Sequence, residues 1–243
     1  DNNLINLCDL KIPNKKVPTH TKEERARLQK AFGYTYEDFR TSILPMALNG
    51  AESIGAMGID TPLAVLSNRH QPLFNYFKQL FAQVTNPPID SIREKIVTST
   101  TVYLGKDGNV LEEKPENCKN LKINNPILTN TDLLKIKNMK VEGFKVETIP
   151  ITYYKNTSIE KAIDHIFVEV DRAHREGANI IILSDRGVDE NHVAIPSLLA
   201  VGAVQHYLVQ TKKRTSMAVI LESGEPRAVS YTHLRAHETE LHL

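Results

Sequence analysis

The sequence has no tryptophan, two cysteines and no excess of charge of either sign. Cys8 and Cys118 form no CxxC pair, which excludes the common zinc and thioredoxin-like motifs. We expect two free thiols in a reducing compartment, with a disulfide between them as the alternative. Lysine and arginine number 30 against 29 acidic residues, and this balance disfavours binding to nucleic acid or to an anionic membrane.

Long hydrophobic runs are also missing. No apolar run approaches the roughly 20 residues that cross a bilayer, and the N-terminal segment DNNLINLCDLKIPNKK lacks the pattern of a secretory signal. We therefore expect a cytoplasmic protein, or a soluble part of an organelle enzyme. The 243 residues are 41% hydrophobic and 24% charged, as in ordinary globular domains, and can bury a core in one or two domains.

The first half of the chain carries the signals of helices and loops. Residues 11–21 are rich in proline, lysine and threonine and indicate a linker. Thr21 and Glu24 match a capping box, which predicts a helix that ends at Gly33. The other expected elements are a helix from Thr35 to about Pro45, a buried strand over 62–66, helices over 72–84 and 89–97, and loops with short helical turns over 105–139, one of them capped by Thr129 to Asp132.

The second half alternates between strands and helices. The expected elements are strands over 144–153, 180–183 and 217–221 and helices over 158–176 and 196–209, the first helix being closed by Gly177. This rhythm predicts a parallel sheet with right-handed crossovers. The fold class is therefore α/β, with βαβ units and a partial parallel sheet over 141–229 that follow a mainly helical part over 21–140.

The last residues differ in character from the rest. From Ser230 the sequence SYTHLRAHETELHL holds three histidines and no clear apolar face. It resembles translated adaptor or vector sequence, so we expect the natural sequence to stop near Val229 and residues 230–243 to be a non-native tail.

The glycine-rich loop NGAESIGAMG has the composition of a nucleotide-binding loop without its spacing. Gly50, Gly55 and Gly58 do not match GxGxxG, and the chain has no GKS or GKT phosphate loop. Glycine also allows a positive φ and the close approach of another segment, so a structural role is favoured.

The histidines indicate no metal site. His165, His174, His192 and His206 are not paired at the spacing of a metal-binding helix, and GxSxG is absent. The basic cluster TKKR at 211–214 has no interleaved aromatic residue and predicts a solvated turn.

Charged side chains follow two of the expected strands. Asp185 and Arg186 come after one strand, and Glu222 and Glu225 come after the next. The carboxyl ends of parallel strands are where α/β proteins place functional groups, and a desolvated carboxylate there could do acid–base work. No nucleophile or metal ligand accompanies them. We therefore favour a charged network in which Arg186 pairs with Asp185 or Glu222, or an interface to another domain.

Several long stretches resemble glutamate synthase, either the large subunit of the NADPH type or the single chain of the ferredoxin type. Taken in order, they cover about residues 11–229. They are QKAFGYTYEDF (29–39), MALNGAESIGAMGIDTPLAVLS (46–67), YFKQLFAQVTNPPIDSIREKIV (76–97), NPILTN (125–130), ILSDRGVDENHVAIPSLLAVGAVQHYL (182–208) and VILESGEPR (219–227).

The resemblance implies an enzyme that makes two L-glutamates from L-glutamine and 2-oxoglutarate. In that family an amidotransferase domain with a cysteine nucleophile releases ammonia, which crosses a tunnel to an FMN-containing barrel. There it forms an imine with 2-oxoglutarate, which is reduced with electrons that arrive through an iron–sulfur cluster. The central domain between these two is regarded as a rudimentary, non-flavin relative of the barrel, so the resemblance implies a partial TIM-barrel-like fold.

This chain departs from the full enzyme in several ways. Residue 1 is Asp, the first cysteine is Cys8, and the family pattern breaks after Arg227. The flavin barrel and the iron–sulfur cysteines do not appear. We assign no catalytic, cofactor-binding or metal-binding residue to the chain, and FMN and an iron–sulfur cluster to the full enzyme. Residues 1–20 would be a linker from a missing amidotransferase domain, and residues 21–229 the central domain.

We therefore expect a scaffold between the glutaminase and FMN synthase sites, with the glycine loop as a candidate wall of the ammonia tunnel. Its partners would be the amidotransferase and synthase domains of the same polypeptide, with no nucleic acid and no membrane, in the cytoplasm or, for a plant-type enzyme, the plastid. The alternative is an autonomous small-molecule α/β enzyme that uses Asp185, Arg186, Glu222 and Glu225. A free-standing protein-binding module is a third option.

Overall fold

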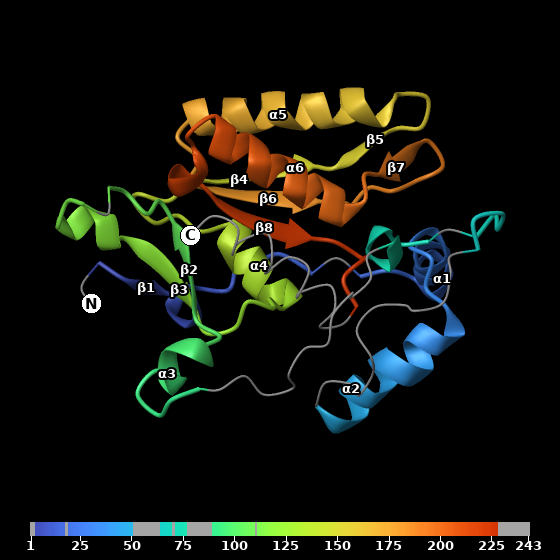
Figure 1. Cartoon of the computed structure of the whole chain (residues 1–243), viewed down its shortest axis with the longest axis horizontal. Helices are drawn as coiled ribbons and strands as arrows, with labels where there is room; N and C mark the ends of the chain where they lie inside the picture. The colour runs from blue at the N-terminus through green and yellow to red at the C-terminus, as the bar shows by residue number, and fades with distance from the viewer. Residues whose placement is uncertain are drawn as a thin grey trace.

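The computed structural model describes residues 3–17, 19–50, 64–69, 71–76, 89–109 and 111–227. Within these residues a parallel sheet lies in the middle (Figure 1). Helices α5 (Ile159–Arg175) and α6 (Ser197–Gln210) cover one face of it, and α4 (Asn130–Lys137) and a small mixed sheet cover the other. The glycines Gly55 and Gly58 and the tail 230–243 lie outside the described residues, so the predictions made for them remain predictions.

The central sheet contains the strands β4 (Val146–Pro150), β6 (Ile180–Ser184) and β8 (Ala218–Glu222) in the order β4-β6-β8, all parallel. Helix α5 (Ile159–Arg175) connects the first pair, and α6 (Ser197–Gln210) connects the second. The predicted α/β class with βαβ units is confirmed. The likeness to a TIM barrel remains a prediction.

The core follows from the alternation of side chains along β6, all of whose residues are buried. Ile181 and Leu183 point to the face covered by α5 and α6, whereas Ile180 and Ile182 point to the other face. A strand with both faces covered must be apolar throughout, which is the pattern that IIIL shows in the sequence.

Local signals determine the ends of α5. The Ser158 side chain accepts a hydrogen bond from the Lys161 N–H at the first turn, which satisfies one of the free donors there. The helix ends before Gly177, whose φ of 84° is a left-handed conformation that glycine adopts without strain. Both ends agree with the predicted helix over 158–176.

A three-stranded sheet that the sequence did not indicate lies on the other side of the core. It contains β1 (Ile5–Asn6), β2 (Val102–Gly105) and β3 (Asn120–Ile123) in the order β1-β3-β2. The prediction of loop and helical turns over 105–139 is wrong for β3, although η4 (Pro115–Cys118) and α4 (Asn130–Lys137), capped by Thr129, agree with it. Strands this short carry little pattern of their own and depend on their partners.

The N-terminal segment that we expected to be a linker contributes to this second sheet. β1 pairs with β3, and the following turn η1 (Leu7–Asp9) buries Leu7 in the core. The boundary at residue 21 remains a prediction.

The strand expected over 144–153 divides into two strands. β4 ends at Pro150, and β5 (Thr152–Tyr154) pairs antiparallel with β7 (His192–Ala194), which the sequence did not indicate. The buried Ile151 lies between them, and its backbone N–H donates to the Ser184 carbonyl at 2.8 Å. The chain therefore leaves one sheet and enters another at this residue.

The N-terminal helices differ from the prediction at their end. The capping box of Thr21 and Glu24 starts α1 (Lys22–Ala31) as predicted. The second helix begins as a π-helical segment, η2 (Asp38–Ile43), and continues as α2 (Leu44–Asn49), so the predicted end near Pro45 is wrong. Pro45 lies in the first turn of α2, where a missing N–H costs little, and the helix ends at Gly50 with a φ of 61°.

Three other predictions are wrong or tested in part. Ala64–Leu66 forms a turn with exposed Val65 and Leu66, and this overturns the buried strand expected there, whose first residues lie outside the described ranges. The helix over 72–84 is described only as the 3₁₀ turn η3 (Leu73–Tyr76). The helix over 89–97 is reduced to α3 (Glu94–Val97). A last 3₁₀ turn, η5 (Arg214–Ser216), precedes β8. Among the described residues no helix is long and apolar enough to cross a membrane.

The packing of α6 on the sheet gives a test of the core. Leu208 is 0% exposed, whereas Leu199 on the same helix is 36% exposed. We expect Leu208→Ala to lower the free energy of unfolding by about 2–5 kcal/mol, because it leaves a cavity in the core. The matched control Leu199→Ala should lower it by less than about 1 kcal/mol. Urea denaturation followed by circular dichroism measures both, and equal losses would contradict this packing.

Candidate functional site

Polar side chains gather where β6 and β8 end. Ser184 and Glu222 are the last residues of these strands and lie opposite each other in the parallel register. The turns that follow these strands carry the other charged side chains that the sequence analysis singled out. The carboxyl edge of the sheet is therefore the candidate site, and each charged group on it has a described partner.

Glu222 is the centre of an ionic network. One of its oxygens, Oε2, accepts hydrogen bonds from Ser184 Oγ and from Lys137 Nζ of α4, each at 2.7 Å, and the other accepts from Arg186 Nε. Burial raises the pKa of this carboxyl, but the bonds from Lys137, Ser184 and Arg186 outweigh it and hold the pKa below its usual value. Glu222 is therefore a charged brace between α4 and two strands.

Arg186 pairs with Glu222, which is one of the two partners that the sequence suggested. Its Nη2 also donates to Asn130 Oδ1 at 3.3 Å, at the start of α4. Glu222 thus binds Lys137, the last residue of α4, and Arg186, whose guanidinium also contacts the first residue of that helix.

Asp185 is buried, with 6% of its surface exposed. Its Oδ2 accepts a hydrogen bond from the Gly224 N–H at 3.0 Å. Burial raises the pKa of this carboxyl and outweighs the hydrogen bonds from Ser223 and Gly224, and the nearby charges of Glu225 and Glu222 add to the rise. A raised pKa in an α/β strand-end loop also occurs at functional sites.

Glu225 caps α6 from a distant part of the chain. The residue before α6 is Pro196, which has no side chain able to accept a hydrogen bond. Instead, Glu225 Oε2 accepts from the Ser197 backbone N–H at 2.7 Å and from Ser197 Oγ at 2.6 Å. A carboxylate at this position also interacts favourably with the positive end of the helix dipole.

Two residues that the sequence analysis did not single out, Tyr34 and Arg227, complete the edge. The Tyr34 hydroxyl donates to the Gly224 carbonyl at 2.7 Å, and the Arg227 guanidinium lies 4.0 Å from the centre of the Tyr34 ring. Burial raises the pKa of the Tyr34 hydroxyl. Both residues lie in stretches that carry the family resemblance, and this was the only signal available for them.

The comparison with known proteins identifies the family of the chain. The family model described as "Glutamate synthase central domain" matches residues 27–235. The chain belongs to this family. The family prediction from the sequence is therefore confirmed, and the matched residues extend past Val229 into the segment that we expected to be non-native.

This central domain is similar to glutamate synthases of several types. It is 43% identical over 203 residues to the "Glutamate synthase [NADPH] large chain" of Bacillus subtilis, which is 84% of this chain and 13% of the relative. It is 45% identical over 206 residues to the "Glutamate synthase [NADH]" of Schizosaccharomyces pombe, 83% and 10% respectively. The "Ferredoxin-dependent glutamate synthase 2" of Synechocystis sp. is 42% identical over 201 residues, 81% and 13%. The chain thus spans about an eighth or less of these relatives.

The histidines and cysteines of the central domain lie apart from this edge. His192 contacts Asp189 at 3.0 Å, and the described residues contain no cluster of three or more His, Cys, Asp or Glu that could hold a metal ion. Cys8 and Cys118 are free and exposed. β1 and β3 run parallel, with Cys8 beyond the end of β1 and Cys118 before the start of β3, so the two thiols are at opposite ends of the sheet.

A groove of about 210 Å³ lies between β5 and the first turns of α5. Its floor is apolar, with Ile151 and Ile166, and its rim carries Tyr153, Lys161 and His165. Asp185, Glu222 and Glu225 do not line it, so the groove and the carboxyl edge are separate features.

The ionic network gives a second test. Glu222 has 8% of its side chain exposed, so Glu222→Gln should lower the free energy of unfolding at neutral pH by about 1–3 kcal/mol through the loss of charged hydrogen bonds. Its folded pKa is lowered, so this stability is present above the usual pKa of 4.5 and disappears as the pH falls through the folded value. Urea denaturation at a series of pH values from neutral to acidic measures the difference between wild type and variant.

Glu147→Gln is the control for this test. Glu147 contacts Arg172 at 3.5 Å on the surface, and its loss should cost less than about 1 kcal/mol. A Glu222→Gln effect no larger than that of Glu147→Gln, or one that grows on acidification, would contradict the described network.

Proposed function

We propose that this chain is the scaffold of a glutamate synthase, which forms two L-glutamates from L-glutamine and 2-oxoglutarate. It holds the glutaminase and synthase centres, which lie in other parts of the same polypeptide, in a fixed relation. The observation that carries the proposal is the use of the strand-end carboxylates. Glu222 braces α4, Glu225 caps α6, and Asp185 accepts a hydrogen bond from the Gly224 N–H.

The residues at the carboxyl edge do not fit FMN. The N-terminus of a helix after a strand is a natural phosphate site, but in this chain Glu225 occupies the N-terminus of α6. A phosphate there would have to displace this carboxylate or lie beside it, and like charges disfavour that. The chain has two cysteines, whereas an iron–sulfur cluster is held by four thiolates. In this proposal both cofactors therefore belong to the other domains, and the enzyme acts in the cytoplasm or, in the plant type, the plastid.

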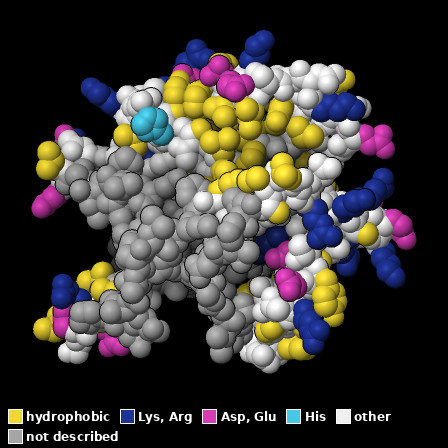
Figure 2. Space-filling view, turned by 45° about the vertical axis from the view of Figure 1, so that its right-hand side comes forward, with side chains coloured by type: hydrophobic (Ala, Val, Ile, Leu, Met, Phe, Trp, Pro, Cys, Tyr) yellow, Lys and Arg dark blue, Asp and Glu magenta, His cyan; other side chains and the backbone are white. Residues whose placement is uncertain are grey.

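The surface of the domain also suits a scaffold. Figure 2 shows hydrophobic side chains gathered in the upper part of the molecule, at the height of α5 and α6 in Figure 1. Tyr154, Val168, Val193 and Leu199 are exposed hydrophobic residues of these helices and of the adjoining strands. Exposed apolar area of this kind suits contact with further domains.

The physical reason for a scaffold is containment of ammonia. Ammonia that escapes to bulk water is protonated and is lost as a nucleophile, so a closed path between the two centres is needed. We propose that the glycine loop with Gly55 and Gly58 contributes to the wall of this path, because glycine lets another segment approach closely.

A larger side chain in the glycine loop tests the proposed role in containing ammonia. We expect Gly55→Leu, in the full-length enzyme, to raise the amount of glutamine hydrolysed per 2-oxoglutarate consumed several-fold, because the added side chain would block the path. Assays of both consumption rates on the same sample measure this ratio.

Gly55→Ala is the matched control, since it restricts the backbone in a similar way and adds little volume. It should leave the ratio near that of wild type. Equal ratios for wild type and Gly55→Leu would show that the loop has no part in the path.

The raised pKa of Asp185 is the one observation that favours an autonomous enzyme using Asp185, Arg186, Glu222 and Glu225. The purified chain separates the two functions. As a scaffold it should release no glutamate from glutamine, with or without added 2-oxoglutarate. Turnover by the chain that Asp185→Asn abolishes, while the far-UV spectrum stays unchanged, would establish the autonomous enzyme.

A further inference from the structure

Among the described residues, the N-terminal helices make their polar contacts with the rest of the molecule at one place. We call residues 21–49, which comprise α1, η2 and α2, the helical arm, and none of these helices has a buried residue. Among the described residues, every hydrogen bond and ion pair between residues 19–50 and the rest of the chain runs to Gly224 or Arg227. Figure 1 shows the arm at the side of the sheet, beyond the end of β8.

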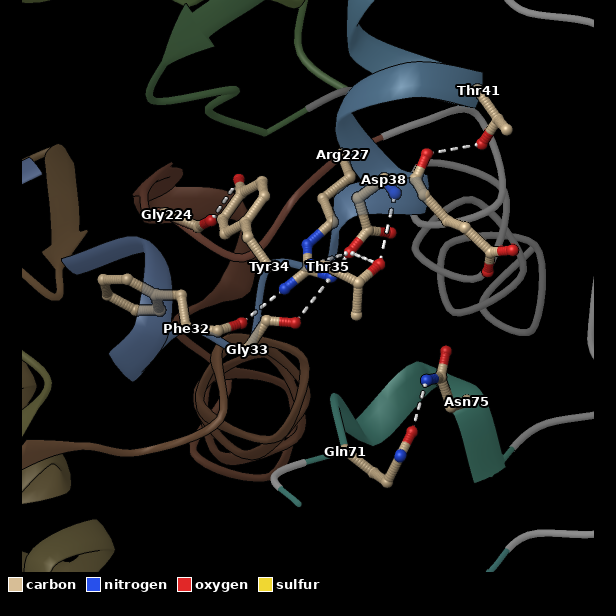
Figure 3. Close-up of polar contacts among 11 residues, drawn as sticks. Phe32, Gly33, Tyr34, Thr35, Asp38, Thr41, Gln71, Asn75, Gly224 and Arg227 are labelled. Atoms are coloured by element: carbon tan, nitrogen blue, oxygen red, sulfur yellow. Dashed lines mark hydrogen bonds and ion pairs between the residues drawn. The ribbon is translucent and has the colours of Figure 1, made fainter. Parts of the chain in front are cut away.

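Arg227 makes most of these contacts (Figure 3). Its guanidinium donates to the carbonyls of Phe32 and Gly33, at the C-terminal end of α1, and forms an ion pair with Asp38 at 2.8 Å. It also stacks over the Tyr34 ring. A cation at a helix C-terminus, a carboxylate partner and an aromatic face together use the planar fork of arginine, which lysine cannot reproduce.

The contacts of Arg227 are largely shielded from water, so they contribute more to stability than a surface ion pair does. The Arg227 side chain is 7% exposed. Asp38 also accepts hydrogen bonds from the Thr35 N–H at 2.8 Å and the Thr35 hydroxyl at 2.9 Å, which tie the start of η2 to the turn before it. Loss of Arg227 would leave Asp38 without its cation and the α1 carbonyls without their donor.

Gly224 lies between the arm and the sheet. Its N–H donates to Asp185, its carbonyl accepts from the Tyr34 hydroxyl, and a Cβ at this position would meet the Phe32 ring at 3.0 Å. The same loop is anchored to α4 through Glu222 and to α6 through Glu225. Residues 222–227 therefore connect the arm with both helical layers around the sheet.

We propose that the contacts of Arg227 and Gly224 with Phe32, Tyr34 and Asp38 form a latch that transmits changes of position between the helical arm and the carboxyl edge of the sheet. None of the three described helices of the arm has a buried residue, so in this proposal the arm moves with the loop when the latch is closed and independently of it when the latch is open. This inference rests on the scaffold role proposed above. The arm and the loop are then the two ends through which the scaffold joins its neighbours.

Hydrogen exchange tests the latch directly. In the 243-residue chain, Arg227→Gln should speed amide exchange in α1 and η2 by about tenfold or more, since the arm loses its charged contacts. Exchange in α5 and α6 should stay as in wild type. Tyr34→Phe, which keeps the ring and loses the bond to Gly224, should give a smaller increase confined to the same helices.

The control for exchange is Arg172→Gln, which removes surface ion pairs on α5 with Glu147 and Glu169. It should leave the arm unchanged. Unchanged exchange in the arm of Arg227→Gln would overturn the latch, and so would an equal acceleration in every helix, because that result describes general destabilisation.

The transmission is tested in the full-length enzyme. Arg227→Gln should raise the glutamine hydrolysed per 2-oxoglutarate consumed, and Arg172→Gln should not. Faster exchange in the arm with an unchanged ratio would reduce the latch to a structural brace and overturn the proposed transmission. Failure of the scaffold role is recognised separately, because the ratio would then also stay unchanged in Gly55→Leu.

Discussion

The burial of β6 on both faces is the constraint on which the rest of the described structure depends. The strand must be covered by α5 and α6 on one face and by α4 and the small sheet on the other. Two separate hydrophobic cores result. Polar groups can then appear only at the strand ends, where Ser184 and Asp185 follow the apolar residues. The carboxyl edge of the sheet is polar because the layers around it are not.

In many α/β proteins such an edge binds a ligand, whereas here its charges bind other parts of the chain. Glu225 occupies the helix end at which a phosphate would bind, and Glu222 accepts from three donors, one each from α4, the end of β6 and the turn after β6. Replacing a carboxylate that is used in this way lowers the stability of the fold, because each loss leaves a buried donor unpaired. A domain of the glutamate synthase family whose edge is filled by its own side chains suits the role of a rigid support.

Sequence reasoning succeeded for helix caps and apolar periodicity, and it failed for short strands and at Pro45. Ser158, Gly177 and the apolar run of β6 predicted α5 and the buried strand correctly, because caps and periodicity act within a few residues. β3 was missed since its short NLKI pattern becomes a strand only through its neighbours β1 and β2. Pro45 was misread as an end, although it is tolerated in the first turn of α2.

The sequence by itself determined the class of the fold, the alternation of strands and helices that gives a parallel sheet, and the family. These follow from side-chain periodicity and from long ordered stretches of similar sequence, which need no knowledge of distant contacts. The tertiary structure alone decided which charges meet. Arg227 reaches Asp38 across a separation of 189 residues, and Glu225 caps α6 across 28. No local pattern encodes such pairs, because their energy arises only when folding removes water from both partners.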